Sequence, residues 1–224
     1  MPNDPVAQFL KILEQGPPNP AGVFNPWRDT DDRDRSPRKL RPAERRENMA
    51  AYLDARRRHA RFLLLGEAPS HRGCRFSGIA FCSETELLQK RDLVAHRPLA
   101  LTSAGAEVKP QRERSAAVIW GELDRAGAAF DVVLWNTFPW HPYQDAVTTN
   151  RRPKTTEVQH GRAALKALLE CFTHELAIFA VGKVAQEGLA RWPEFECAGY
   201  MRHPAQGGEA LFREHFRKQV ASRL

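Results

Sequence analysis

Four short, mainly apolar runs that pass directly into turn-forming or polar residues limit most strongly how this chain can fold. They lie at residues 62–66, 131–135, 176–181 and 195–201. Such runs are typical of strands buried on both faces of a sheet. Because the carboxyl ends of parallel strands meet at one edge of a sheet, we expect Gly66, Asn136 and His203, which end or follow three of these runs, to lie close together.

Segments with helical patterns separate the four runs. Ser83, followed three residues later by Glu86, forms the capping-box pattern that begins a helix. Further helices are predicted at 115–126, 157–171, 184–190 and 209–224. This alternation predicts an α/β fold of three layers (α/β/α), in which helices cover both faces of a central four-stranded parallel sheet.

The length and the N-terminal pattern predict one globular domain with an extension. All four strands fall within residues 61–224, which form the predicted domain, and residues 1–60 are predicted as a helical and irregular extension packed on its core. Within the extension we expect a helix at 5–15 and no regular structure in the proline-rich segment 16–27. A second helix is expected from Pro42, whose fixed φ suits a first helical turn.

The chain is basic. Its 34 Lys and Arg residues exceed its 27 Asp and Glu residues, which gives a net charge of +7. A basic surface attracts polyanions such as DNA, although the same charge also serves solubility. The mixed-charge stretch 28–46 therefore has two interpretations, an arm that lies along DNA or a solvated part of a packed extension.

Composition also argues against membrane and metal classes. No run of about 18 apolar residues occurs and the first 15 residues lack a secretory-signal pattern, so we expect a cytoplasmic protein without a membrane span. The four cysteines contain no closely spaced pair, and we expect them to be free thiols that bind neither zinc nor an iron–sulfur cluster. No metal and no organic cofactor is therefore predicted. The cysteines are Cys74, Cys82, Cys171 and Cys197.

Three motifs at the predicted strand ends resemble those of the uracil-DNA glycosylase superfamily. The sequence GEAP at 66–69 is similar to the first loop of the superfamily, and GIAF at 78–81 is similar to the G-x-x-F element that ends this loop. Asn136 is similar to an Asn after the second strand, and HPA at 203–205 is similar to the last motif. The order and the intervals of the motifs also agree, and the resemblance covers residues 60–220.

The resemblance implies a monofunctional DNA repair enzyme that flips uracil out of DNA and hydrolyses its N-glycosidic bond, which leaves an abasic site. It implies that Phe81 stacks on the base, that the Asn136 amide reads its polar edge, and that His203 donates a hydrogen bond to a base oxygen as negative charge develops. The implied base-binding residues are Gly66, Ala68, Pro69, Phe81, Asn136 and His203.

Two departures from the superfamily pattern affect the mechanism. Ala68 stands where the best-known branch has an Asp that positions water, so Glu67 or His71 substitutes for it, or backbone groups hold the water. The wedge that fills the space of the flipped base would be Gln206, which precedes two glycines. Because the chain lacks the cysteine spacing of the cluster-binding branch, it resembles most a bacterial, cluster-free branch with the GEAP loop.

Several basic residues near the motifs are candidate DNA contacts. With Gln206 they are Arg72, Arg75, Arg151, Arg152, Lys154 and Arg202. Three alternatives to a uracil glycosylase stay open: a non-catalytic or weakly catalytic sensor of uracil or abasic DNA, an enzyme for another deaminated base or a nucleoside, and an α/β protein whose motifs occur by chance. We expect a monomer in each case.

Overall fold

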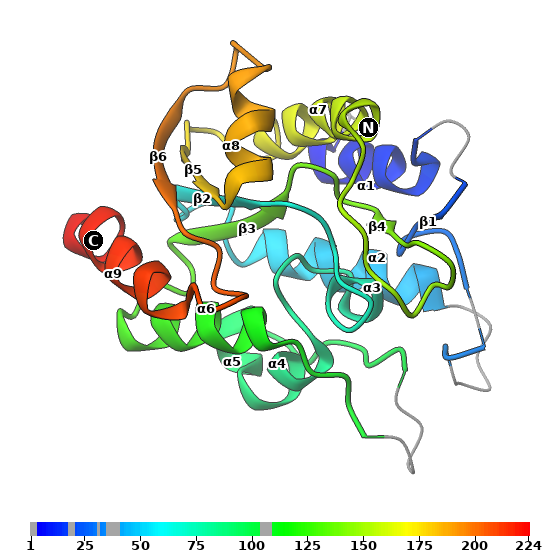
Figure 1. Cartoon of the computed structure of the whole chain (residues 1–224). Coiled ribbons are helices and arrows are strands. Elements are labelled where there is room, and N and C mark those ends of the chain that lie inside the picture. The colour runs from blue at the N-terminus through cyan, green and yellow to red at the C-terminus, as the bar shows by residue number, and fades with distance from the viewer. Residues whose placement is uncertain (1–3, 18–20, 31, 35–40, 104–108) are drawn as a thin grey trace.

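A four-stranded parallel sheet forms the centre of the computed structural model, which describes residues 4–17, 21–30, 32–34, 41–103 and 109–224. The strands lie in the order β3, β2, β5, β6 (Figure 1), as β3 Val132–Asn136, β2 Phe62–Gly66, β5 Ala177–Val181 and β6 Cys197–Met201. The predicted α/β class and four-stranded parallel sheet are thus confirmed, with each strand within two residues of its predicted bounds.

The order of the strands explains why helices lie on both faces of the sheet. The chain moves one way from β2 to β3, and the opposite way from β3 to β5 and on to β6. Because parallel crossovers are right-handed, a reversal of direction moves the connecting helices to the other face. Figure 1 shows α7 Thr155–Leu169 and α8 Lys183–Ala190 on one side of the sheet, and α6 Arg114–Arg125 with α9 Glu209–Gln219 on the other.

Shorter elements complete the fold. The predicted N-terminal helices are α1 Pro5–Gln15 and α2 Arg41–Asp54, and the predicted capping box of Ser83 and Glu86 opens α4 Glu84–Gln89. The prediction of no regular structure at 16–27 is wrong for β1 Val23–Phe24, which pairs antiparallel with β4 His141–Pro142. The remaining elements are α3 Cys74–Ser77, α5 Arg91–Val94 and a 3₁₀ turn, η1 Ala221–Arg223.

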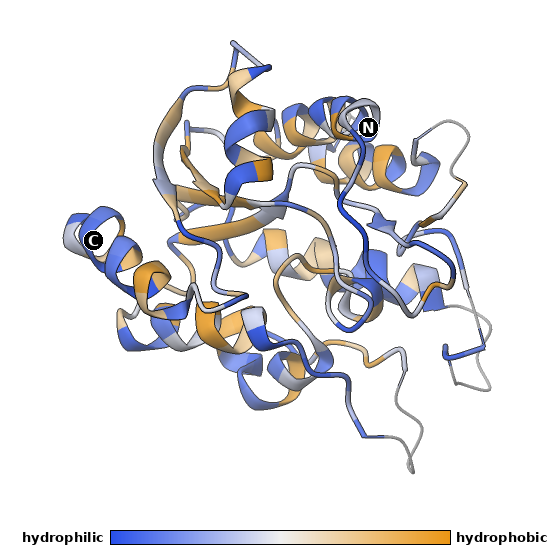
Figure 2. Ribbon diagram, viewed as in Figure 1, coloured by the Kyte–Doolittle hydropathy of each residue, from blue (hydrophilic) through white to orange (hydrophobic). Residues whose placement is uncertain are grey.

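The hydrophobic core surrounds β2 and β3, which are buried along their whole length. Figure 2 shows the hydrophobic residues of the sheet in orange. The described part of the first 60 residues contributes to this core. Phe9 packs on Trp135 with ring centroids 5.3 Å apart, and the Tyr52 hydroxyl accepts a hydrogen bond of 2.8 Å from the Leu134 amide. The Trp140 indole donates a hydrogen bond of 2.9 Å to a carbonyl of α1. The N-terminal segments therefore pack against β3 and form part of the core.

A buried arginine joins the N-terminal segment to the core. The Arg56 guanidinium donates hydrogen bonds to five backbone carbonyl oxygens, those of Tyr52, Leu93, Val94, Ala129 and Val132. It also stacks on the Tyr52 ring, with its central carbon 3.8 Å from the ring centroid. A buried cation is tolerated where its donors are satisfied. Arg56 therefore links three segments that are distant in sequence.

Three observations bear on membrane and metal chemistry. None of the helices in the described ranges is long and apolar enough to cross a bilayer. All four cysteines are free; Cys74, Cys82 and Cys171 are buried, whereas Cys197 is exposed on the edge strand β6. The described ranges hold no group of three or more His, Cys, Asp or Glu side chains arranged to bind a metal ion.

Candidate functional site

The carboxyl edge of the sheet brings the predicted residues together. Gly66 at the end of β2 pairs in register with Asn136 at the end of β3, and Met201, two residues before His203, pairs with Val181 of β5. The connections that leave β2 and β5 run in opposite directions, and a crevice forms at such a reversal in parallel sheets. A cavity of about 560 Å³, here called the edge cavity, opens at this point between residues 67–70, 81, 113, 115, 150–152, 182–184, 202–203 and 205–206.

Gly66 allows the closest contact at the floor of the site. A Cβ atom at this position would lie 2.1 Å from the Phe81 ring and 2.9 Å from Asn136 Oδ1. Phe81 itself has a φ of 50°, an unusual value for a residue with a side chain. The missing side chain of Gly66 therefore lets the ring and the amide lie against the end of the strand.

The ring of Phe81 also lies close to His203. Their ring centroids are 5.9 Å apart, with 40° between the ring planes. Gly182 makes room on the other side, since a Cβ there would lie 3.1 Å from the His203 Cβ. A flat apolar surface and an imidazole thus face the edge cavity together, at the ends of β2, β5 and β6.

The surroundings of His203 define its protonation state. Burial, with a smaller effect from Arg202, lowers the pKa of His203 to about 4, so the ring is neutral at pH 7. The Ala205 amide donates a hydrogen bond of 3.1 Å to His203 Nδ1. A neutral imidazole carries one proton, which must then lie on Nε2. His203 can therefore donate a hydrogen bond from Nε2 without carrying a charge.

Asn136 has an unsatisfied acceptor. Its side chain is 2% exposed, and Oδ1 has no hydrogen-bond donor among the residues that the structure describes. Leaving a buried amide oxygen unpaired costs about 1–3 kcal/mol, so such groups are often completed by a ligand. The hydroxyl and the amide of the neighbouring Thr137 both donate hydrogen bonds of 2.9 Å to the Gly66 carbonyl oxygen.

Comparison with known proteins agrees with this geometry. The family model of the uracil DNA glycosylase superfamily matches residues 54–220. The chain belongs to this superfamily. Among solved structures, the crystal structure of wild-type SMUG2 from Pedobacter heparinus is similar, with a TM-score of 0.68 and 15% sequence identity over 98% of this chain and 97% of that chain. A search of curated proteins found no match.

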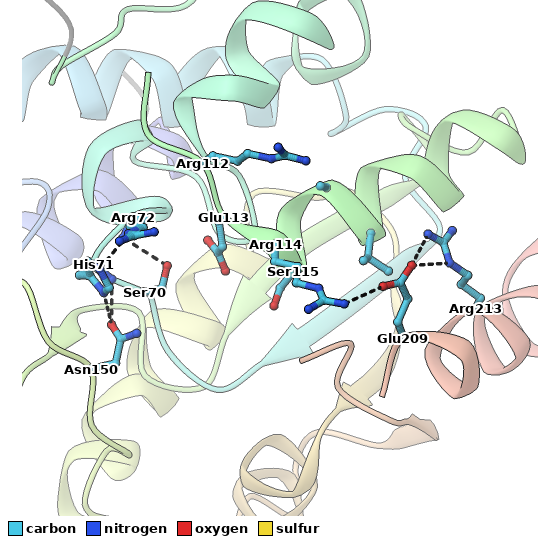
Figure 3. Close-up of a pocket in the computed structure, with 12 residues that line it drawn as sticks. Ser70, His71, Arg72, Arg112, Glu113, Arg114, Ser115, Asn150, Glu209 and Arg213 are labelled. Atoms are coloured by element: carbon cyan, nitrogen blue, oxygen red, sulfur yellow. Dashed lines mark hydrogen bonds and ion pairs between the residues drawn. The ribbon is translucent and has the colours of Figure 1, made fainter. Parts of the chain in front are cut away.

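Within the superfamily fold, Glu67 and His71 occupy different places. Glu67 borders the edge cavity, and burial, opposed by Arg152, raises the pKa of its carboxyl. His71 lies in a neighbouring cavity of about 700 Å³, here called the outer cavity (Figure 3). Its Nδ1 lies 3.2 Å from Asn150 Oδ1 and its Nε2 accepts a hydrogen bond of 3.1 Å from Arg72. The structure therefore does not bring His71 into the edge cavity, and both its ring nitrogens are engaged.

The predicted DNA-contact residues are likewise distributed between the two cavities and the surface. Arg152, Arg202 and Gln206 line the edge cavity, Arg72 lines the outer cavity, and Lys154 is exposed at the start of α7. Arg151 also borders the edge cavity, but its guanidinium is held by both oxygens of Glu157 at 2.6 and 2.7 Å.

The interpretation of Arg75 as a DNA contact is wrong for this structure. Its side chain is fully buried, and its guanidinium lies 4.4 Å from the ring centroid of Phe24 and 4.2 Å from that of Phe76. Arg75 therefore holds α3 against β1 and does not face the solvent from which DNA would approach.

Glu113 is a carboxylate of the edge cavity that was not predicted from the sequence. It follows a charged, irregular segment, and no strand-end or motif signal marks it. His141, by contrast, shapes the loops beside the site. Its ring is buried between the carbonyl oxygens of Pro69 and Val147, at 2.9 and 3.1 Å, and it joins the loop after β2 to the loop after β4.

Proposed function

We propose that this protein is a monofunctional glycosylase that removes uracil from DNA by hydrolysis of the N-glycosidic bond. The observation that carries the proposal is the combination of an unpaired buried acceptor, Asn136 Oδ1, with a neutral His203 beside the Phe81 ring. Membership of the superfamily supports a glycosylase acting on DNA. The net charge of +7 suits a polyanionic substrate.

The proposed base contacts follow from hydrogen-bond chemistry. Uracil presents an N–H group between two carbonyl oxygens, so Asn136 Oδ1 accepts from the N–H while its amide nitrogen donates to one oxygen. Cytosine lacks that N–H and would leave Oδ1 unpaired. Phe81 covers one face of the flipped base. The unpaired acceptor thus favours a deaminated base over the normal one.

His203 would act on the leaving group. As the glycosidic bond breaks, negative charge develops on the base oxygens, and a preorganised donor lowers the energy of that state. Nε2–H of a neutral imidazole supplies such a donor. In this proposal no metal or organic cofactor takes part, and Gln206, whose φ is 52°, lies next to the site as the residue that would enter the base stack.

A second candidate substrate class shares the same hydrogen-bond edge. Deaminated purines also present an N–H beside a carbonyl oxygen, which Asn136 could read in the same way. Ala68, smaller than the Asp it replaces, lines the edge cavity of about 560 Å³. Hypoxanthine and xanthine are therefore included in the test, as is a sensor that binds abasic DNA without releasing a base.

The wider setting is part of the proposal. We place the chain in the cluster-free branch with the GEAP loop, as a cytoplasmic protein that acts as a monomer on DNA. The division into an extension at 1–60 and a domain at 61–224 also remains a prediction.

Base release from labelled oligonucleotides tests the function. Duplexes with a single U:G or U:A pair, or with one hypoxanthine or xanthine, are incubated with the protein in EDTA, and strand breakage is read after alkali. We expect cleavage at uracil by the wild-type protein. Removal of a preorganised donor typically lowers a rate by about 10²–10³-fold, and we expect losses of this size in N136A and H203A.

A matched control variant shows whether a loss of rate is specific to the site. H59A removes an exposed histidine just before β2, at the opposite end of the strands from the site, and should keep the wild-type rate. Wild-type rates in both N136A and H203A would overturn the assignment. Tight binding of abasic DNA without release of any base would favour the sensor.

A further inference from the structure

Glu113 lies on the wall that the edge cavity shares with the outer cavity. It lines both, together with Ser70, Ser115 and Asn150. Figure 3 shows its carboxyl between Ser70 and Ser115, at the start of α6. Glu113 therefore borders the space that holds Phe81 and His203, although it comes from a segment far from the three motifs.

The carboxyl of Glu113 does not serve the helix it precedes. Glu113 is the N-cap residue of α6, yet its side chain makes no capping hydrogen bond. Its carboxyl turns instead to the loop after β2, where it takes part in a hydrogen bond with Ser70. A Cβ on Gly73 would lie 1.7 Å from Glu113 Oε2, so only a glycine leaves room for the carboxyl in this place. The loop is thus shaped to receive it.

The surroundings of Glu113 bring the pKa of its carboxyl close to neutral pH. Burial, with a smaller effect from the Glu86 carboxylate, raises the pKa of Glu113 to about 7, and the Ser70 hydrogen bond opposes this rise. Cys74 and Cys82 also lie near it, and burial raises the pKa of both thiols, so they stay neutral at pH 7. The other charged or titratable groups of the outer cavity are His71, Arg72, Arg112, Arg114, Glu209 and Arg213, and those of the edge cavity are Glu67, Arg151, Arg152, Lys183, Arg202 and His203.

We propose that Glu113 is the carboxylate that orients the attacking water and accepts its proton, in the role left vacant by Ala68. This inference rests on the proposed function. The bond between the base nitrogen and C1′ of the sugar breaks, and its electron pair leaves with the base. Water forms a bond to C1′, and its proton passes to Glu113. The products are an abasic sugar and a base anion that His203 holds by a hydrogen bond. The base anion then takes up a proton from solvent, and Glu113 releases the proton it accepted to solvent.

Two other candidates for the water are less well placed. His71 lies in the outer cavity with both ring nitrogens engaged. Glu67 borders the edge cavity, but the charges that act on it are those of Arg152 and Glu187, which form an ion pair of 2.6 Å. An arginine lowers the pKa of a neighbouring carboxyl and makes it a weaker base, as Arg152 does for Glu67, whereas the groups that act on the pKa of Glu113 besides burial are Ser70 and Glu86. Glu113 is thus the better proton acceptor.

The experiment compares E113Q with the wild-type protein in single-turnover release of the susceptible base across pH 5–9. Gln keeps the size of the side chain and the contact with Ser70 but cannot accept a proton. We expect E113Q to lose about 10²–10⁴-fold in rate, the usual contribution of a positioned base. The wild-type rate should rise with pH and level off above about 7, the pKa of Glu113, and this rise should be absent in E113Q.

Two further variants keep the test specific. E209Q removes a carboxylate from the outer cavity alone and should leave the rate and its pH profile unchanged. G73A adds a Cβ that would meet Glu113 Oε2 at 1.7 Å, on a backbone (φ −105°, ψ −118°) that disfavours alanine, and should displace the Glu113 carboxyl and slow release. Binding to a duplex with an uncleavable abasic analogue should be equal in E113Q and the wild-type protein.

The outcomes separate this inference from the proposed function. Base release by the wild-type protein with an unchanged rate and pH profile in E113Q overturns the role of Glu113 only. A full loss in E67Q together with an active E113Q assigns the water to Glu67 and also overturns it. No release of any base by the wild-type protein overturns the proposed function itself.

Discussion

Gly66 shows how one missing side chain can shape a site. A Cβ there would lie 2.1 Å from the Phe81 ring and 2.9 Å from Asn136 Oδ1. Since neither the buried ring nor the buried amide can retreat into the core without a cost, the G66A variant should push Phe81 out of its place. We expect base release to fall at least about 10-fold, as for other losses of positioning.

Gly121 offers the control for this prediction. A Cβ at Gly121 meets nothing within 4 Å, so G121A on α6 should keep the wild-type rate and raise the melting temperature slightly. Single-turnover rates and thermal melting of the two variants check both statements. Equal rates in G66A and the wild-type protein would show that Phe81 does not need its observed position.

For single residues, the sequence predicted the place in the fold better than the role of the side chain. Gly66, Asn136 and His203 each end or follow a strand, and parallel strands bring such residues to one edge. Glu113 could not be predicted, because its contact with Gly73 joins segments forty residues apart and carries no local pattern. Arg75 was misread because nearness in sequence to a motif says nothing of the direction in which a side chain points.

Among the elements, α2 and its C-terminal turn depend on Arg56. Substitution by methionine in R56M would leave five carbonyl oxygens without their donor. A buried acceptor left without its donor costs about 1–3 kcal/mol, and because several are affected we expect the free energy of unfolding to fall by at least about 3 kcal/mol. Urea denaturation followed by circular dichroism measures it.

The next residue in the chain provides the comparison. Arg57 is half-exposed and pairs with Asp54 at 3.2 Å, and surface pairs contribute about 0–1 kcal/mol. R57M should therefore unfold at nearly the wild-type urea concentration. A similar small effect of R56M would show that the carbonyls of Leu93, Ala129 and Val132 find other donors.

The elements themselves were largely predictable, for a physical reason. Each strand of the main sheet is a run whose side chains are apolar enough to be buried, and each long helix repeats its apolar side chains every three to four residues. The strands β1 and β4 hold two residues each, too few for any period to appear. Their pairing depends on tertiary contacts.

At the scale of the whole molecule, charge should govern affinity for DNA. Each phosphate contact releases counterions, so removing one such contact should reduce the slope of log K against log salt by about 1. We expect this change in R152A, R202A and K154A, measured by fluorescence anisotropy over a series of salt concentrations.

A basic residue remote from the site tests whether position matters. Arg191 lies at the C-terminal end of α8, whereas the site lies at the N-terminal end of this helix. R191A should keep the wild-type slope. Equal slopes in all four variants and the wild-type protein would mean that DNA does not approach this edge of the sheet.

The origin of the site residues also has a consequence for synthesis. The site takes Phe81 from the segment after β2, Asn136 from the end of β3 and His203 from the loop after the edge strand β6. On the ribosome, β2 and β3 leave the exit tunnel long before β6 does. A nascent chain can therefore form the floor of the cavity early, yet it gains the group that faces the leaving base only after β6 has been made.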